Sequence, residues 1–78
     1  MAAFSQDDVG KRVVAQSGAT VGEVAEVRDG TAWVELAPDA DDEVVSELEW
    51  DGVVNRNRHE LDGRFVTRVT EDAVRLRV

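Results

Sequence analysis

The sequence predicts a mainly β fold, a small barrel of about six strands with one short helix. Its 78 residues allow a single domain spanning residues 1–78. Fifteen of them are valine, a residue that favours strands. Two-residue turn signals recur at short spacing, at residues 17–18, 29–30, 62–63 and 71–72. Short strands joined by tight turns are typical of a small barrel or sandwich.

The first element expected is one capped helical turn over residues 5–10. Ser5 is the predicted N-cap, and Asp8 stands three positions later, where an acidic side chain can return a hydrogen bond to the cap. Gly10 ends the turn. Residues 11–16 are then expected to form the first strand.

A β-hairpin is predicted for residues 21–28 and 31–37, joined by an Asp-Gly dipeptide, the strongest two-residue turn signal. Alternation along the second strand places Trp33 on the outer side. Either the helix or the N-terminal segment covers this ring, or it belongs to a protein interface, where aromatic residues are enriched. The alternation along the first strand breaks, so a bulge is expected near residues 22–24.

One helix is predicted over residues 39–50. Asp39 is the expected N-cap, and the acidic residues 41–43 suit the positive end of a helix. The apolar positions share one narrow face: Ala40, Val44, Val45 and Leu48. This helix is therefore expected to close one end of the sheet.

The last part of the chain predicts a short strand over residues 59–61 and a hairpin of residues 65–70 and 73–78. With Glu71-Asp72 as its loop, Phe65, Thr67 and Val69 are expected to face the core.

The outer face of that last hairpin is the predicted partner-binding surface. It is expected to carry Val66 and four arginines, Arg64, Arg68, Arg75 and Arg77, with Arg68 opposite Arg75 and Arg77 opposite Val66. Like charges directly opposite one another destabilise a sheet. Carboxylates that offset this repulsion can come either from the acidic helix of the same chain or from an acidic partner, and the sequence does not decide between the two. Together with Trp33, these residues form the predicted interaction site.

The charge balance is strongly acidic, with 9 Lys+Arg against 17 Asp+Glu and a net charge of −8. Eight of the nine basic residues are arginine, and the acidity is concentrated in residues 1–55. Many acids with almost no lysine are typical of a protein from a salt-loving cell, where screening mutes self-repulsion. The same acidity argues against non-specific binding to nucleic acid.

Several chemistries are not expected. The chain has no cysteine, which excludes disulfides and thiol chemistry. The run over residues 39–43 lacks the glycine and the glutamate that an EF-hand loop requires at its sixth and twelfth positions. His59 is the only histidine and has no serine in a nucleophile context. No phosphate-binding glycine motif occurs. We therefore expect no enzyme activity, no metal and no cofactor.

The sequence also offers no membrane segment, since no apolar run approaches the about 20 residues that a span needs. The first residues lack the charged and apolar regions of a signal peptide. We expect a cytoplasmic protein that does not insert into the membrane.

The order of these signals resembles the PRC-barrel family, small β-barrels found in photosynthetic reaction-centre H subunits and in the ribosome-maturation factor RimM. The segments that carry the likeness are Phe4 with Asp8-Val9-Gly10-Lys11-Arg12-Val13, Gly18 with Val21-Gly22-Glu23-Val24, Leu48-Glu49-Trp50, and Val66 with Val69-Thr70-Glu71-Asp72-Ala73-Val74-Arg75-Leu76. The likeness is greatest to the stand-alone acidic members of haloarchaea, some of which are similar to CdpB-type cell-division proteins.

The resemblance implies a non-enzymatic adaptor that acts at mid-cell in archaeal cell division. Its implied partners are SepF-like and FtsZ-ring proteins, a second copy in a homodimer, or another PRC-barrel protein. The alternative is a ribosome- or RNA-associated module of the RimM kind. Two departures from the family are the absence of a membrane helix and of a companion domain. The helix also ends in Leu48-Glu49-Trp50 where close relatives are expected to have Leu-Gly-Trp.

Overall fold

The computed structural model describes residues 4–48, 50 and 58–78. Within these ranges the chain forms six strands, one α-helix and two 3₁₀ turns. In chain order the elements are η1 (Gln6–Asp8), β1 (Arg12–Val14), β2 (Thr20–Arg28), β3 (Thr31–Leu36), α1 (Asp42–Glu47), β4 (Arg58–Leu61), η2 (Gly63–Phe65), β5 (Val66–Val69) and β6 (Ala73–Leu76). The predicted mainly β fold with one short helix is confirmed.

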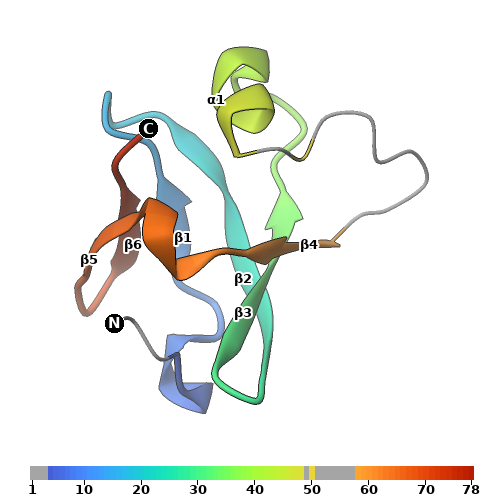
Figure 1. The fold of residues 1–78 in the computed structure, drawn as a ribbon. Helices are drawn as coiled ribbons and strands as arrows, with labels where there is room; N and C mark the ends of the chain where they lie inside the picture. The colour runs from blue at the N-terminus through green and yellow to red at the C-terminus, as the bar shows by residue number, and fades with distance from the viewer. Residues whose placement is uncertain (1–3, 49, 51–57) are drawn as a thin grey trace.

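All six strands belong to one sheet, in the order β4-β3-β2-β1-β6-β5. Neighbouring strands are antiparallel except for β1 and β6, which run parallel. The sheet curls into a half-barrel, with α1 above one end and η1 at the other (Figure 1). This curl gives the sheet an enclosed inner face and an open outer face.

The inner face carries a valine-rich core. The largest of the fully buried side chains are Val13, Val21, Val24, Val34 and Val74. Val44 of α1 and its C-cap residue Leu48 pack into the same cluster from one end, and Phe4 from the other. Thus α1 closes the sheet as expected.

The β2–β3 hairpin has the predicted register at its tip, where Val27 pairs with Ala32 and Glu26 with Trp33. The pairing of β2 with β1 has a register shift that makes Val21 an additional residue, just before the expected bulge at residues 22–24. In the pairing of β2 with β3 a bulge lies between Val24 and Glu26, just after that position. The extra residue is Ala25. Beyond it Val24 takes the inward position opposite Val34.

A further bulge changes the last hairpin. Val66 pairs with Leu76, whereas Arg68 pairs with Arg75, so Thr67 is the additional residue. Because an extra residue inverts the phase of a strand, Val66 points into the core and is only 8% exposed. The prediction that Val66 faces outward is wrong, and Val69, expected inside, is 37% exposed.

The helix is shorter than predicted and begins two residues later. A turn precedes it, in which the Ala40 N–H donates to the Ala37 carbonyl over 3.1 Å. Asp41, rather than Asp39, is the N-cap, since its carboxylate accepts from the Glu43 N–H at 2.9 Å. At its other end α1 stops at Glu47, with Leu48 as the C-cap, rather than at the predicted residue 50. No helix in the described ranges is long and apolar enough to cross a membrane.

Candidate protein-interaction site

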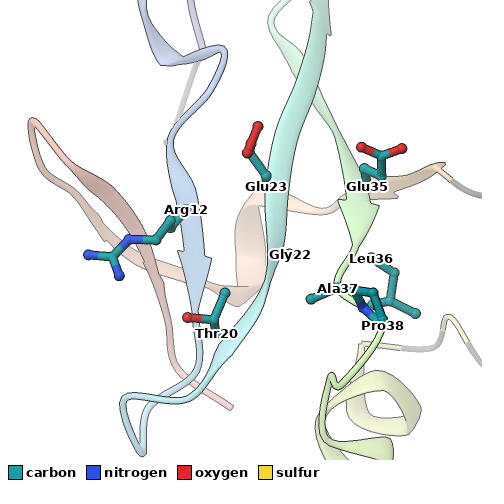
Figure 2. Close-up of a pocket in the computed structure, with 8 residues that line it drawn as sticks. All are labelled: Arg12, Thr20, Gly22, Glu23, Glu35, Leu36, Ala37 and Pro38. Atoms are coloured by element: carbon teal, nitrogen blue, oxygen red, sulfur yellow. The ribbon is translucent and has the colours of Figure 1, made fainter.

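Charged side chains occupy the outer face of the sheet in cross-strand register. Arg12 of β1 pairs with Glu23 of β2, and Glu23 pairs with Glu35 of β3. Residues directly opposite in a sheet share a face, and all three side chains are exposed. Figure 2 shows them on three adjacent strands. Glu23 and Glu35 therefore form an acidic pair, which we call the acidic half of the outer face.

The other half of this face is basic. Arg12 is level with Ala73 of β6, so Arg75, two residues further along β6, lies on the same face. Arg75 pairs directly with Arg68 of β5, and both are exposed. Arg12, Arg75 and Arg68 thus follow one another over the strands β1, β6 and β5. We call them the basic half.

Neither half is neutralised by ion pairs among the described residues. Salt bridges there engage other arginines: Arg28 and Arg58 each contact Glu26, at 2.5 and 3.3 Å, and Arg64 contacts Asp62 at 3.3 Å. Within those residues, no salt bridge joins the acids of α1 to the basic half; α1 instead sits at the end of the sheet (Figure 1).

A hollow of about 740 Å³ opens beside the acidic half. Its wall includes Arg12, both glutamates of the acidic half, and the segment Leu36–Ala37–Pro38 that leaves β3 (Figure 2). Gly22 forms part of the lining, and a Cβ there would meet the backbone carbonyl of Glu35. The hollow offers carboxylates together with apolar side-chain surface.

One family model matches residues 4–76, and it is described as a family of unknown function (DUF8593). The chain belongs to that family. No curated protein and no solved structure matches this member of DUF8593.

The residues predicted as an interaction site are only partly brought together in this DUF8593 chain. Arg68 and Arg75 are opposite each other as expected, and Arg77 is exposed just beyond β6. Arg77 is not opposite Val66, because the bulge moves its backbone N–H to the Phe65 carbonyl, at 2.8 Å. Arg64 lies in η2, where its guanidinium is 4.9 Å from the centroid of the Phe65 ring.

Trp33 belongs to a different part of the sheet. It lies on β3, and the strands β2 and β1 separate it from the arginines of β6 and β5. Its cross-strand neighbours are Glu26 and Glu60, and its side chain is half-buried. Trp33 is therefore not part of the basic half.

The acidic half was not predicted from the sequence. In an unbulged register the alternation would place Glu23 opposite Leu36 on the core side, and this conflict is why a bulge was expected near residues 22–24, but no pairing of Glu23 with Glu35 was predicted. With the bulge at Ala25, Glu23 moves outward and pairs with Glu35. The inward carboxylate indicated that a bulge was needed, since a carboxylate is costly to bury, but it did not indicate which residue was the extra one.

Two polar residues are buried among the described positions, and both have structural partners. The Asp8 carboxylate accepts from Lys11 Nζ at 2.7 Å and from the Ser5 N–H at 3.0 Å. The lysine contact is the main reason why the pKa of Asp8 lies below its usual value. His59 stacks on Trp50, with ring centroids 5.0 Å apart. No group of three potential metal ligands occurs within the described ranges.

Proposed function

We propose that this protein is a non-enzymatic adaptor that binds an acidic protein surface through the basic half of its sheet. The observation that carries the proposal is Arg68 directly opposite Arg75, both exposed and without an ion pair among the described residues. Like charges in this arrangement lower the stability of the isolated sheet. A carboxylate-bearing partner removes that cost and gains bidentate contacts, which the planar guanidinium favours.

The two buried polar side chains support a binding role over a catalytic one. The Asp8 carboxylate accepts hydrogen bonds from the Ser5 N–H and from Lys11 Nζ, and the His59 ring packs against Trp50 in the core. Both groups therefore serve the fold, and the exposed chemistry is that of charged side chains on a sheet.

The cellular role proposed is that of a PRC-barrel-like scaffold of the CdpB kind in the FtsZ-based division of salt-loving archaea. The resemblance along residues 4–76, a six-stranded half-barrel with one short helix and the acidic composition support it. The proposed partners are SepF-like or FtsZ-ring proteins and barrels of the same kind, at mid-cell on the cytoplasmic side. The proposal requires no cofactor.

The binding test compares the wild-type chain with the double variant Arg68→Ala/Arg75→Ala. The double variant is expected to keep or raise its melting temperature, because a repulsive pair is removed, and to lose binding to a purified SepF-like protein in molar KCl. Arg28→Ala/Arg58→Ala is the matched control, since it removes two arginines that are already paired with Glu26. Unchanged binding by the first variant, or equal loss in the control, contradicts the proposal.

The cellular test is the position of a fluorescent fusion in a haloarchaeal host. A ring at mid-cell is the expected result. Co-sedimentation with ribosomal subunits in place of a ring would contradict the division role and favour the RimM-like alternative.

A further inference from the structure

We propose that the outer face of the sheet is self-complementary and that the acidic surface bound by its arginines is the acidic half of a second copy. This inference rests on the proposed function and names its partner. The two copies would be related by a two-fold axis that lies over β1 and runs parallel to the strands.

The strand order supplies the symmetry. Glu23 and Glu35 lie one and two strands to one side of β1, whereas Arg75 and Arg68 lie one and two strands to the other side. Neighbouring strands are about 4.8 Å apart. Each half therefore extends roughly 5 to 10 Å from β1 in opposite directions.

Rotation about an axis along β1 exchanges the two sides of the face. It places Glu23 across from Arg75 of the second copy and Glu35 across from Arg68 of the second copy, and each contact occurs twice. The arginines are displaced by two residues along the strands, since Ala73 is the residue level with Arg12. That displacement is about 6.6 Å, which a long, flexible arginine side chain can span.

The hollow beside the acidic half suits such a contact. Glu23 and Glu35 provide carboxylates for a guanidinium, while Leu36 and Pro38 provide apolar surface for its methylene groups (Figure 2). Near the axis, each Arg12 would lie between Glu23 of its own chain and Glu23 of the second copy. The two arginines at the centre therefore have acidic neighbours on both sides.

A second copy supplies opposite charges to both the acidic and the basic half at once, whereas a purely acidic partner supplies them only to the basic half. A contact in which the same surface patch is used by both subunits is the normal geometry of a closed dimer. In this arrangement division proteins bind the assembled pair, so loss of the pair also weakens their binding.

Two charge-reversed variants test the geometry. One is Glu23→Arg/Glu35→Arg, and the other is Arg68→Glu/Arg75→Glu. Their masses are measured by analytical ultracentrifugation at the lowest KCl concentration at which circular dichroism shows each to be folded. The matched control is Asp42→Arg/Glu47→Arg, which reverses two exposed charges on α1.

The expected result is that the wild type and the control sediment at twice the 8.6 kDa mass of one chain. Each charge-reversed variant should sediment as a monomer, because residues 23 and 35 of one copy then carry the same sign of charge as residues 75 and 68 of the other. An equal mixture of the two variants should recover the dimer, since all the contacts become complementary again.

A wild type that remains monomeric at about 100 μM, a concentration well above a micromolar Kd, overturns the inference. So does a charge-reversed variant that still dimerises alone, or a mixture that does not. If the wild type is monomeric but binding of a SepF-like protein still depends on Arg68 and Arg75, the inference fails while the proposed function stands.

Discussion

Replacing Gly22 with alanine should destabilise the protein, even though glycine is normally unfavourable in a strand. The backbone at Gly22 does not have the positive φ that requires glycine, so an alanine without steric conflict would stabilise by about 0.4–1 kcal/mol. Instead, the added Cβ would meet the Glu35 carbonyl oxygen and lie 2.9 Å from Val34 Cγ1. Overpacking of this kind costs about 1–3 kcal/mol. For a domain of this size the melting temperature should fall by about 4–24 °C.

The assay is thermal unfolding followed by circular dichroism, with the combined variant Gly22→Ala/Val34→Ala beside each single change. Trimming Val34 removes only one of the two obstacles, and the backbone oxygen of Glu35 cannot move without breaking the β2–β3 register. The combined variant should therefore recover little of the loss caused by Gly22→Ala. A Gly22→Ala protein that melts at or above the wild-type temperature would refute the reasoning.

Three further predictions concern stability. The Asp8 carboxylate has a lowered pKa in the folded state, so its contact with Lys11 stabilises the protein above the ordinary value of 3.8 and is lost as pH falls through the folded value. Asp8→Asn should cost about 1.5 kcal/mol at pH 7, and melting curves at decreasing pH should show its difference from wild type vanish in acid. Trp50→Phe keeps an aromatic ring but loses the 3.1 Å hydrogen bond that the indole N–H donates to the Glu60 carbonyl. This loss should lower the free energy of unfolding by about 0.5–1.5 kcal/mol, measured by urea titration. An unchanged urea midpoint would contradict this. The exposed acids of α1 repel one another, and KCl shortens the screening length from about 10 Å at 0.1 M to about 3 Å at 1 M. The melting temperature should therefore rise with the KCl concentration. A melting temperature that does not change over the KCl series would contradict the halophilic interpretation.

The sequence was a good guide wherever a local signal determines the structure. The Asp-Gly turn at residues 29–30 produced the tip of the β2–β3 hairpin in the expected register, with Asp29 at a φ of 53° and Gly30 at 79°. The Ser5 and Asp8 spacing identified η1, in which the Asp8 carboxylate accepts from the Ser5 N–H. These contacts join residues close in sequence, so the residue pattern alone carries them.

The bulges were harder to place, because an extra residue in a strand leaves no mark in its composition. The bulge at Thr67 turned Val66 into the core, and the bulge at Ala25 brought Glu23 to the surface opposite Glu35. The candidate site could therefore be predicted only in part. The pairing of Arg68 with Arg75 is determined by a short loop, whereas the pairing in the acidic half depends on which residue of β2 forms the bulge. The parallel pairing of β1 with β6 joins distant segments and had no local signal at all.

That parallel pairing has a consequence for how the chain reaches its fold. The β1–β6 pair joins residues 12–14 to residues 73–75, so the ribosome must complete nearly all of this sequence before β1 can acquire its second neighbour. Until then, β1 has an unsatisfied edge, and the hairpins on either side can form but cannot join. Contacts between such distant segments slow folding, because the intervening chain must first be ordered. Synthesis at about 5–20 residues per second therefore leaves an interval of seconds in which a half-made sheet exposes its valines.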